Sequence, residues 1–295
     1  MSDWTILKII SWSESYFRSH SIDNPRFTAE ILLSFSLDIK RIELYLQHDR
    51  PLNKDELKLY KQLIKRRINR EPVAYITGEK GFYNHDFITP PFVLIPRPDT
   101  ETLVETALQY LKLKEDNTSP KKVLELGAGS GAVIISLADL HPEHAYFASD
   151  FSLEAVKTVR LNAQKILTES KIHLLNSSWL DAVKNKELFD VIIANPPYIP
   201  TSDIDTLAGE IKYYEPVMAL DGGQDGLDCF REILTHAADH LLPDGVLLLE
   251  IGFDQKEGVA DIAASCPDWD SAGFIKDLAG HFRVAVIKKR LSSAE

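Results

Sequence analysis

The chain has 295 residues, of which 44% are hydrophobic and 26% are charged, and its formal net charge is −11 at pH 7. This composition is typical of a globular protein that is long enough for one large domain and one smaller domain. The excess of acidic residues argues against broad, charge-driven binding to bare nucleic acid, because phosphate contacts need a surplus of Lys and Arg.

No apolar run approaches the roughly 20 residues needed to cross a bilayer, and the N-terminal segment lacks the basic start and the cleavage site of a signal peptide. We therefore expect a cytoplasmic protein without membrane contact. The two cysteines, Cys229 and Cys266, have no partners at metal-ligand spacing, so we expect two buried thiols. The histidines show no zinc-binding spacing, and no metal is expected. A monomer is the default expectation.

Residues 1–72 have the pattern of a small all-helical domain. Apolar residues recur at helical spacing in "TAEILLSFSL" and "KDELKLYKQLIKRRI", with breaks at Asn24-Pro25 and Pro51. A basic run in the second of these segments comprises Lys61, Lys65, Arg66, Arg67 and Arg70. We interpret this run as a solvated helix surface, with an acidic partner face as the alternative.

Residues 73–118 are expected to form a hairpin and a linker helix. Aromatic and β-branched residues surround Gly78 and Gly81 in the stretch 73–95, which predicts the hairpin. A helix is expected from Asp99 to Leu113, followed by a polar loop at 114–120.

Residues 119–295 alternate short apolar strands with amphipathic helices, from "KKVLELG" to "FRVAVIKK". This alternation is typical of an α/β protein with a doubly wound sheet. In such a sheet, ligands bind at the carboxyl ends of the strands near the topological switch point.

The first strand of this region ends in a glycine-rich turn, "VLELGAGSGAV", with Gly127, Gly129 and Gly131. Glycine lets the backbone approach a ligand closely, and the following helix start offers free N–H groups. Gly127, Gly129 and Ala132 also fit the dinucleotide fingerprint, so this turn alone does not separate a nicotinamide cofactor from S-adenosylmethionine.

The second strand ends in "YFASD", which places Asp150 about 20 residues beyond the glycines, where a carboxylate accepts hydrogen bonds from ribose hydroxyls. The alternative role for Asp150 is a helix N-cap, for which Ser152 competes. A nucleoside ligand is therefore predicted, and its identity stays open at this point.

A later buried strand, "FDVIIAN", ends in Asn195-Pro196-Pro197-Tyr198. A planar NH2 group is a poor nucleophile, and acceptors must orient it if it is to attack an electrophilic methyl carbon. The Asn195 side-chain oxygen and the Pro196 carbonyl suit this task, because the two prolines keep the backbone extended, and Tyr198 offers a flat face. Such a site works by alignment and by stabilising developing positive charge on nitrogen, whereas hydride transfer needs nothing of the kind.

The glycine turn, Asp150 and the Asn-Pro-Pro-Tyr stretch resemble the amino-methyltransferases, which use S-adenosylmethionine. "EPVAYITGEKGFYNHDF", "LIPRPDTETLVETAL" and "YEPVMALDGGQDGL" narrow the resemblance. Over nearly its whole length the chain is similar to the protein-(glutamine-N5) methyltransferases of peptide chain release factors, the PrmC or HemK family. This resemblance implies a Rossmann-like, seven-stranded methyltransferase sheet, preceded by the helical domain as a substrate-recognition domain and by a β-hairpin linker.

The resemblance also implies a reaction, in which a methyl group passes from S-adenosylmethionine to the glutamine amide of the Gly-Gly-Gln motif in class 1 release factors. Asn195 and the Pro196 carbonyl would bind that amide, with Pro197 and Tyr198 shaping the slot, and S-adenosylhomocysteine would be the product. The implied cofactor-binding residues are Glu125, Gly127, Ala128, Gly129, Gly131, Asp150, Phe151, Ser178, Trp179 and Asn195.

Within that set, Asp150 is expected at the ribose and the Trp179 ring against the adenine. Ser178 stands where the family commonly has Asp, which removes a carboxylate from the adenine edge. Glu125 has two alternative roles, either orienting the glycine turn or reaching the methionine ammonium group.

Other motifs have structural interpretations. Arg97 and Asp99 in "RPDTE" are expected to pair, or to mark a helix start with Pro98 in its first turn. Tyr214-Glu215-Pro216 is assigned either to a substrate channel or to surface packing. Gly222-Gly223-Gln224 repeats the tripeptide that the family methylates, but we interpret it as a turn before a helix.

Two rival functions remain. The first is a nucleic-acid exocyclic-amine methyltransferase that shares the Asn-Pro-Pro-Tyr stretch, and the net acidity and the helical domain count against it. The second is a binding protein that has lost the chemistry, although every motif is intact. No direct nucleic-acid binding is expected.

Overall fold

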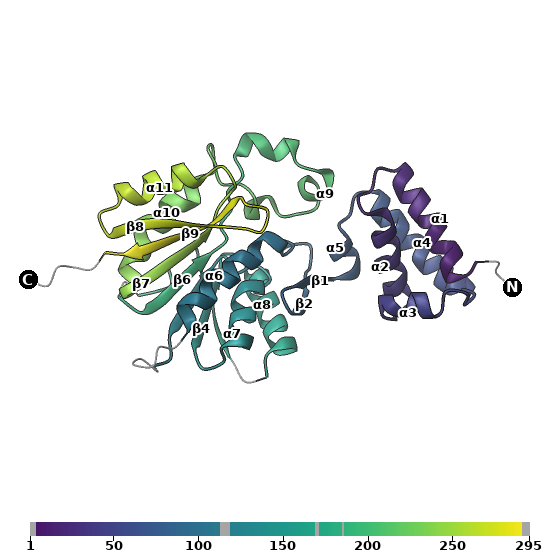
Figure 1. The fold of residues 1–295 in the computed structure, drawn as a ribbon, viewed down its shortest axis with the longest axis horizontal. Helices are drawn as coiled ribbons and strands as arrows, with labels where there is room; N and C mark the ends of the chain where they lie inside the picture. The colour runs from purple at the N-terminus through teal and green to yellow at the C-terminus, as the bar shows by residue number, and fades with distance from the viewer. Residues whose placement is uncertain (1–3, 113–118, 169–170, 185, 291–295) are drawn as a thin grey trace, which may run out of the picture. The chain divides into compact units, whose positions relative to one another are not determined.

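The computed structural model describes residues 4–112, 119–168, 171–184 and 186–290, which form two compact units (Figure 1). The helical unit comprises the residues up to Glu79 together with Ala208–Tyr214. The sheet unit comprises Lys80–Leu207 and the residues from Glu215 onward. The expected polar loop at 114–120 and the end of the preceding helix at Leu113 lie largely outside the described residues.

The described helices of the helical unit are α1 (Ile6–Ser19), α2 (Pro25–Leu37), α3 (Arg41–Leu46), α4 (Lys54–Ile68), α5 (Val73–Thr77) and α9 (Gly209–Lys212). The buried faces of α1 to α5 share one apolar core that includes Phe17, Leu32 and Tyr60, and α9 has no residue in it. The start of α4 shows how local sequence sets a boundary. The Asn53 side chain accepts the N–H of Glu56, and the Glu56 carboxylate accepts the N–H of Asn53, which together form a capping box.

The helix α5 corrects the expectation that the hairpin begins at residue 73. Its side chains Ala74, Tyr75 and Ile76 are buried, and Gly78 ends it with φ +80°. Burial in the helical unit therefore outweighs the strand preference of the β-branched residues, and a left-handed glycine stops the helix. The hairpin itself is present, as β1 (Glu79–Phe82) and β2 (His85–Ile88).

The sheet unit is built on a seven-stranded sheet with the order β5-β4-β3-β6-β7-β9-β8. Its strands are β3 (Lys122–Leu126), β4 (Ala145–Asp150), β5 (Ile172–Asn176), β6 (Phe189–Ala194), β7 (Leu241–Glu250), β8 (Trp269–Lys276) and β9 (Phe282–Lys289). Strands β3 to β7 pair in parallel, whereas β9 pairs antiparallel with both β7 and β8.

Helices cover both faces of this sheet. The described helices are α6 (Glu101–Leu111), α7 (Ala132–Leu140), α8 (Leu153–Ile166), α10 (Asp228–His236) and α11 (Lys256–Ser265). Short 3-10 turns lie at Pro98–Thr100, Thr201–Thr206, Val217–Ala219 and Ala237–His240. Residues of α6, α7 and α8 share a core with one face of the sheet, and residues of α10 and α11 share a core with the other.

The alternation along β3 shows the two faces, because Val123 belongs to the first core and Leu124 to the second. Parallel strands buried on both faces read as continuous apolar runs, which is why their sequence signal is clear. After α10, a short 3-10 turn ends at His240, and β7 begins directly at Leu241.

The switch point of the sheet lies between β3 and β6. These strands are neighbours, with Leu126 paired with Ala194, but the chain leaves β3 toward β4 and β5 before it returns to β6. The glycine turn after β3 and the Asn-Pro-Pro-Tyr stretch after β6 therefore meet at one edge of the sheet.

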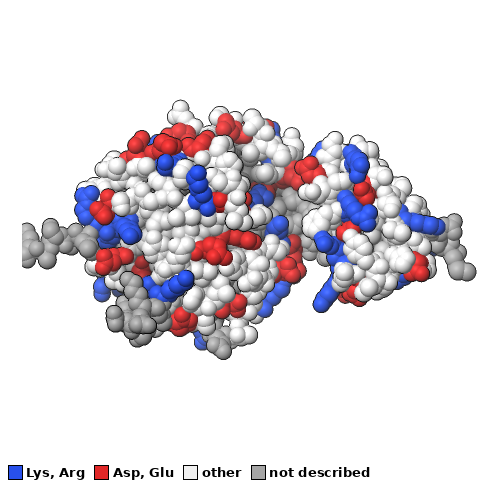
Figure 2. Space-filling model, viewed as in Figure 1, with Lys and Arg blue, Asp and Glu red and all other residues white. Residues whose placement is uncertain are grey.

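Charged side chains of both signs are interspersed on the visible face of the sheet unit, without one broad basic surface on that face (Figure 2). Within the described residues, no helix has both the length and the apolar character that crossing a membrane requires.

Candidate active site

A cavity of about 500 Å³ lies in the sheet unit beside the glycine turn and the end of β6. The predicted site residues that line it are Gly127, Gly129, Asp150, Phe151, Ser178, Trp179, Asn195 and Pro197. The predicted residues outside its lining are Glu125, Ala128, Gly131, Pro196 and Tyr198. Sequence reasoning missed other lining residues, among them Phe92, Leu94, Met218 and Cys229.

The three glycines of the turn all have positive φ, at +65° for Gly127, +56° for Gly129 and +79° for Gly131. Their surroundings differ. A Cβ at Gly131 would lie 2.9 Å from side-chain carbons of Ile135 and Val159, whereas one at Gly129 would meet nothing within 4 Å. Gly131 therefore permits close packing of α7, and Gly129 leaves open space at the cavity.

The Asp150 carboxylate holds the glycine turn in place. Oδ2 accepts the Gly129 N–H at 2.8 Å, and Oδ1 accepts the Ser152 N–H at 2.8 Å. Burial raises the pKa of Asp150, and these two hydrogen bonds act in the opposite direction. The N-cap of α8 is Ser152, whose hydroxyl oxygen accepts the Ala155 N–H, so the capping role left open for Asp150 belongs to Ser152.

Glu125 lies under the turn and is 3% exposed. Its Oε2 accepts the Ile134 N–H at 3.0 Å in the first turn of α7. Burial raises the pKa of Glu125 to about 8, and the nearby charge of Asp150 acts in the same direction. The observed contact is the one expected for a residue that orients the turn, and the alternative contact with a methionine ammonium group stays a prediction.

Trp179 also lines the cavity, and its ring lies beside Gly127 of the glycine turn. It has φ +38°, and its ring lies 3.5 Å from the position that a Cβ on Gly127 would occupy. Its carbonyl accepts a hydrogen bond from the Ser149 hydroxyl at 3.1 Å. The ring is therefore held beside the glycine turn, where a planar ligand group can stack on it.

The Asn195 amide lies at the end of β6 and lines the cavity. Its Nδ2 donates to Thr100 Oγ1 at 3.3 Å. This contact uses the nitrogen of the amide and leaves the oxygen as an acceptor for a ligand.

Two residues near the end of β7 hold Tyr198. The phenol donates to Glu250 Oε1 at 3.4 Å, and the Tyr198 carbonyl accepts from Gln255 Nε2 at 2.8 Å. Neither Glu250 nor Gln255 was a predicted site residue. The available signal for Glu250 was a charged residue at the end of the apolar strand "GVLLLE", the same type of signal that identified Asp150 and Asn195.

Of the two alternatives for Arg97 and Asp99, the pair is wrong and the helix start is observed, because a 3-10 turn begins at Pro98. Arg97 binds Glu215, and Asp99 binds Arg283 at 3.1 Å. The Glu215 side chain is 1% exposed and also accepts the Ile95 N–H, whereas the Asp99 side chain is 57% exposed. A buried carboxylate needs a counter-charge more than an exposed one, so Arg97 pairs with Glu215. Of the neighbouring residues, Pro216 lines the cavity, and Tyr214 donates to the Asn69 carbonyl within the helical unit.

The Gly-Gly-Gln tripeptide forms the expected turn before α10. The Gly222 N–H donates to the Ile199 carbonyl, and a Cβ at Gly222 would lie 2.8 Å from Tyr198 Cα. Gly223 has φ +89°, and Gln224 is exposed. Gly222 lets the turn pack directly against Tyr198, and Gly223 lets it pack against the Asp228 side chain.

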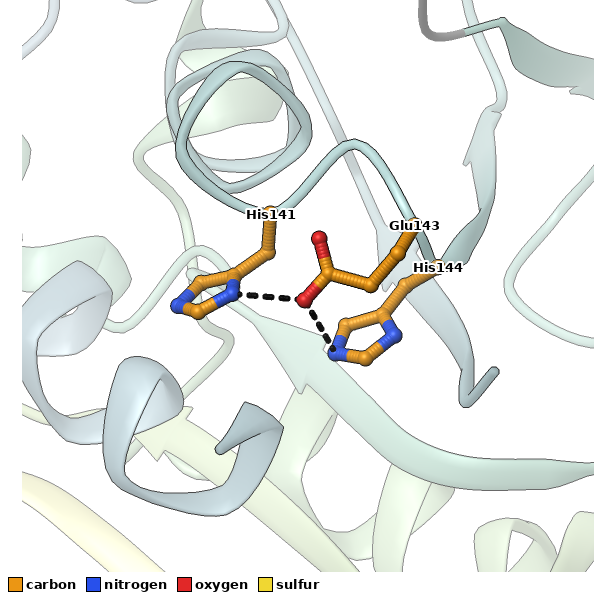
Figure 3. A group of neighbouring side chains, drawn as sticks. All are labelled: His141, Glu143 and His144. Carbon is orange, nitrogen blue, oxygen red and sulfur yellow. Dashed lines mark hydrogen bonds and ion pairs between the residues drawn. The ribbon is translucent and has the colours of Figure 1, made fainter. Parts of the chain in front are cut away.

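His141, Glu143 and His144 are close enough to be considered as metal ligands (Figure 3). His144 Nδ1 accepts the Lys121 N–H, and Nε2 lies 2.8 Å from the Leu111 carbonyl, to which it must donate. Both ring nitrogens therefore have backbone partners, and His141 bonds to Glu143 at 2.9 Å. This arrangement is a structural hydrogen-bond cluster.

Cys229 and Cys266 are only partly buried, whereas the sequence predicted buried thiols. Burial raises the pKa of the Cys229 thiol to about 11.

Two family profiles match the chain, the PrmC N-terminal domain over residues 8–78 and the methyltransferase small domain over residues 101–211. The release factor glutamine methyltransferase of Geobacter sulfurreducens is 39% identical over 256 residues, which are 87% of each chain. The chain belongs to the release factor glutamine methyltransferase family. The release factor glutamine methyltransferase of Rhodopirellula baltica is 32% identical over 287 residues, 97% of each chain.

Among solved structures, this release factor glutamine methyltransferase has the fold of the hMettl16 catalytic domain in complex with MAT2A 3'UTR hairpin 6. The TM-score is 0.55 with 10% identity, over 71% of this chain and 77% of that chain, so the likeness concerns the fold alone. The matches confirm the predicted family and its S-adenosylmethionine-dependent protein-glutamine methyltransferase activity. The strand order confirms the predicted Rossmann-like seven-stranded sheet.

Proposed function

We propose that this enzyme methylates the side-chain amide nitrogen of the glutamine in the Gly-Gly-Gln motif of class 1 peptide chain release factors. The observation that carries the proposal is the Asn195 amide at the cavity, with its nitrogen bonded to Thr100 and its oxygen available as an acceptor. Its family relatives named as release factor glutamine methyltransferases support the choice of substrate.

The cavity suits S-adenosylmethionine in size and in chemistry. A volume of about 500 Å³ lies in the range typical of small-molecule sites. Asp150 accepts two backbone N–H groups, and each carboxylate oxygen retains a lone pair for a ribose hydroxyl. Gly127 and Gly129 would face the methionine portion, and Trp179 would stack on the adenine. The bound cofactor supplies a methyl group on a sulfonium sulfur, which is a strong electrophile.

The protein's task in the reaction is to orient a weak nucleophile. Asn195 Oδ1 and the Pro196 carbonyl accept the two hydrogens of the glutamine NH2 group, and Tyr198 and Pro197 flank its plane. A bound S-adenosylmethionine would supply the methyl carbon as the electrophile, with the electron pair of the broken bond left on its sulfur, and Asn195 and Pro196 would hold the amide nitrogen toward that carbon. The nitrogen becomes acidic as it gains the methyl group and loses one proton to water, so no dedicated base is required.

The decisive test is a methyl-transfer assay with labelled S-adenosylmethionine and a purified class 1 release factor. The matched control is the same factor with Gly-Gly-Ala in place of Gly-Gly-Gln. We expect label on the wild-type factor alone, located at that glutamine by peptide mass mapping. If both factors stay unlabelled while the enzyme binds the cofactor, the proposed substrate is wrong and nucleic-acid amines become the next substrates to assay.

Three further expectations stay predictions: that the protein is cytoplasmic, that it is a monomer, and that it does not bind nucleic acid directly.

A further inference from the structure

We propose that Glu250, acting through Thr100, is a positioning residue that sets which end of the Asn195 amide faces the substrate. The inference rests on the proposed function, because it concerns how the acceptor of that reaction is oriented. It involves two buried residues that do not line the cavity.

Glu250 is placed beside Asn195 by the sheet itself. Leu249 of β7 pairs with Ala194 of β6 in parallel register, so Glu250 and Asn195 are the next residues along two neighbouring strands. The Glu250 residue is 1% exposed. Its Oε1 accepts the Tyr198 phenol at 3.4 Å, but its Oε2 is buried and has no hydrogen-bond partner among the described residues. A buried carboxylate oxygen in that state requires an explanation, because leaving it unpaired costs free energy.

Thr100 supplies the link. Its hydroxyl oxygen accepts Asn195 Nδ2 at 3.3 Å, and its hydroxyl hydrogen requires an acceptor, which the unpartnered Oε2 of Glu250 can provide. Burial raises the pKa of Glu250, and hydrogen bonding by Thr100 acts against that effect. A threonine hydroxyl has only one hydrogen to donate. When the ionised Glu250 takes that hydrogen, Thr100 has none left for Asn195. Asn195 must then turn its nitrogen toward Thr100, which leaves its oxygen pointing to the substrate NH2 group.

Protonation of Glu250 would remove this constraint. A neutral Glu250 donates its own hydrogen to Thr100, which frees the threonine hydrogen to bind Asn195 Oδ1. The Asn195 amide is then stable in the opposite orientation, with its NH2 group facing the substrate NH2 group, where two donors oppose each other. The ionised state of Glu250 is therefore the one that favours methyl transfer.

The charged and titratable groups around Glu250 set the pH at which this change occurs. Burial raises the pKa of Glu250 to about 7, and Asp99 acts in the same direction, whereas hydrogen bonding by Thr100 and Tyr198 and the charge of Arg283 lower it. Arg283 is itself shared with Asp99 and Asp277, and Arg97 acts on the neighbouring Tyr198.

The test compares Glu250→Gln, Thr100→Val and Thr100→Ser with the wild type, using labelled methyl transfer to the release factor and the cofactor Kd. Glutamine keeps the shape of Glu250 but donates from its nitrogen. We expect Glu250→Gln to lower kcat by about tenfold or more at pH 8, with the cofactor Kd changed by less than about twofold. Wild-type kcat should rise between about pH 6 and 8, and this rise should be absent in Glu250→Gln.

Thr100→Val should lower kcat to a similar extent, and the double variant should be no worse than either single variant, because both changes break one chain of bonds. Thr100→Ser keeps the hydroxyl and should retain most of the activity. The matched control is Thr106→Val, which changes a buried threonine whose hydroxyl bonds only within its own helix, to the Thr102 carbonyl.

The proposal is overturned if Glu250→Gln has the same kcat and the same pH profile as the wild type. It is also overturned if this variant loses kcat and cofactor affinity to the same extent. If Glu250→Gln fails to fold, Thr100→Val decides, because full activity of that variant contradicts the link. A wild-type enzyme that does not label the release factor contradicts the proposed function instead, so the two failures are distinguishable.

Discussion

Asn195 has one side-chain oxygen and one side-chain nitrogen, and the contact with Thr100 uses the nitrogen. That allocation matters more than the presence of an amide at this position. In the proposed reaction, an acceptor that faces the substrate NH2 group aligns it, whereas a donor in the same place repels it. The proposed role of Asn195 therefore depends on hydrogen-bond direction, which a residue's identity alone does not specify.

Replacing Asn195 with Ala should lower kcat by about 10²- to 10³-fold, because one of the two acceptors for the glutamine amide is lost. The cofactor Kd should change little, since the other lining residues remain. Steady-state kinetics and calorimetric titration measure the two quantities. Asn53→Ala, which removes the cap of α4, is the control that should lower stability without lowering kcat. Equal losses of turnover and cofactor affinity in Asn195→Ala would mean that this residue mainly builds the cofactor pocket.

Asp150→Ala should have the opposite profile. It removes the proposed ribose acceptor and leaves the Gly129 N–H without its partner, so the cofactor Kd should rise by about tenfold or more. At saturating cofactor, kcat should fall much less. A cofactor Kd equal to that of the wild type would contradict the proposed ribose contact.

Sequence reasoning identified Asn195 and Asp150 because each is a polar residue at the end of an apolar strand. The same signal was present at Glu250, but the role proposed for Glu250 depends on Thr100, which lies on a different element and far away in sequence. The wrong pairing of Arg97 with Asp99 has a similar cause. Proximity in sequence suggested a partner, whereas the burial of Glu215 decides which carboxylate takes the cation.

At the scale of elements, the glycine turn combines packing with ligand access. Gly131 lies at the start of α7 and permits its contact with α8, while Gly129 borders the cavity. Both residues have positive φ, so an alanine at either position costs about 1 kcal/mol of backbone strain.

Gly131→Ala should therefore destabilise the protein more than Gly129→Ala, because only the former also forces a close contact with Ile135 and Val159. We expect a total loss of about 2 to 4 kcal/mol for Gly131→Ala, measured by denaturant unfolding. Gly129→Ala should raise the cofactor Kd more than Gly131→Ala does, because it narrows the cavity. A reversed order in both measurements would contradict this division of roles.

The parallel strands of the sheet unit were predictable because strands buried on both faces are continuous apolar runs, and the helices were predictable as the amphipathic segments between them. The helix α5 was not, since its sequence favours a strand and only burial within the helical unit makes it helical. The helix α9 has four residues, too few for a periodic pattern, and its place in the helical unit depends on contacts with residues far away in sequence.

At the scale of the whole molecule, two buried carboxyl groups link stability to pH. Burial raises the pKa of Glu125 from its ordinary value of 4.5 to about 8 and that of Glu250 to about 7. Between pH 4.5 and these values, the folded protein binds more protons than the unfolded chain. The free energy of unfolding therefore falls as pH rises through this window, and the contribution of each group is fully present below pH 4.5.

Glu125→Gln removes the titration but retains an acceptor for the Ile134 N–H. Relative to the wild type, the variant should gain stability as the pH is raised from about 5 to about 8.5. Thermal unfolding of both proteins at these two pH values gives the Tm of the variant minus that of the wild type, and this difference should increase with pH. Parallel pH dependence of the two proteins would show that the buried Glu125 does not titrate in this range.

The membership of α9 in the helical unit has a consequence for the order in which the protein is made. Arg67 differs from the solvated surface expected for its basic run, because it is 3% exposed and pairs with Glu210 at 2.5 Å, and Tyr214 bonds to the Asn69 carbonyl. A nascent chain has α1 to α5 early, but the carboxylate for Arg67 follows only 143 residues after it, which is on the order of ten seconds at typical translation rates. Until then, the guanidinium must stay hydrated or buried without its counter-charge. The domain that begins first on the ribosome is thus completed only when much of the second one has already been synthesised.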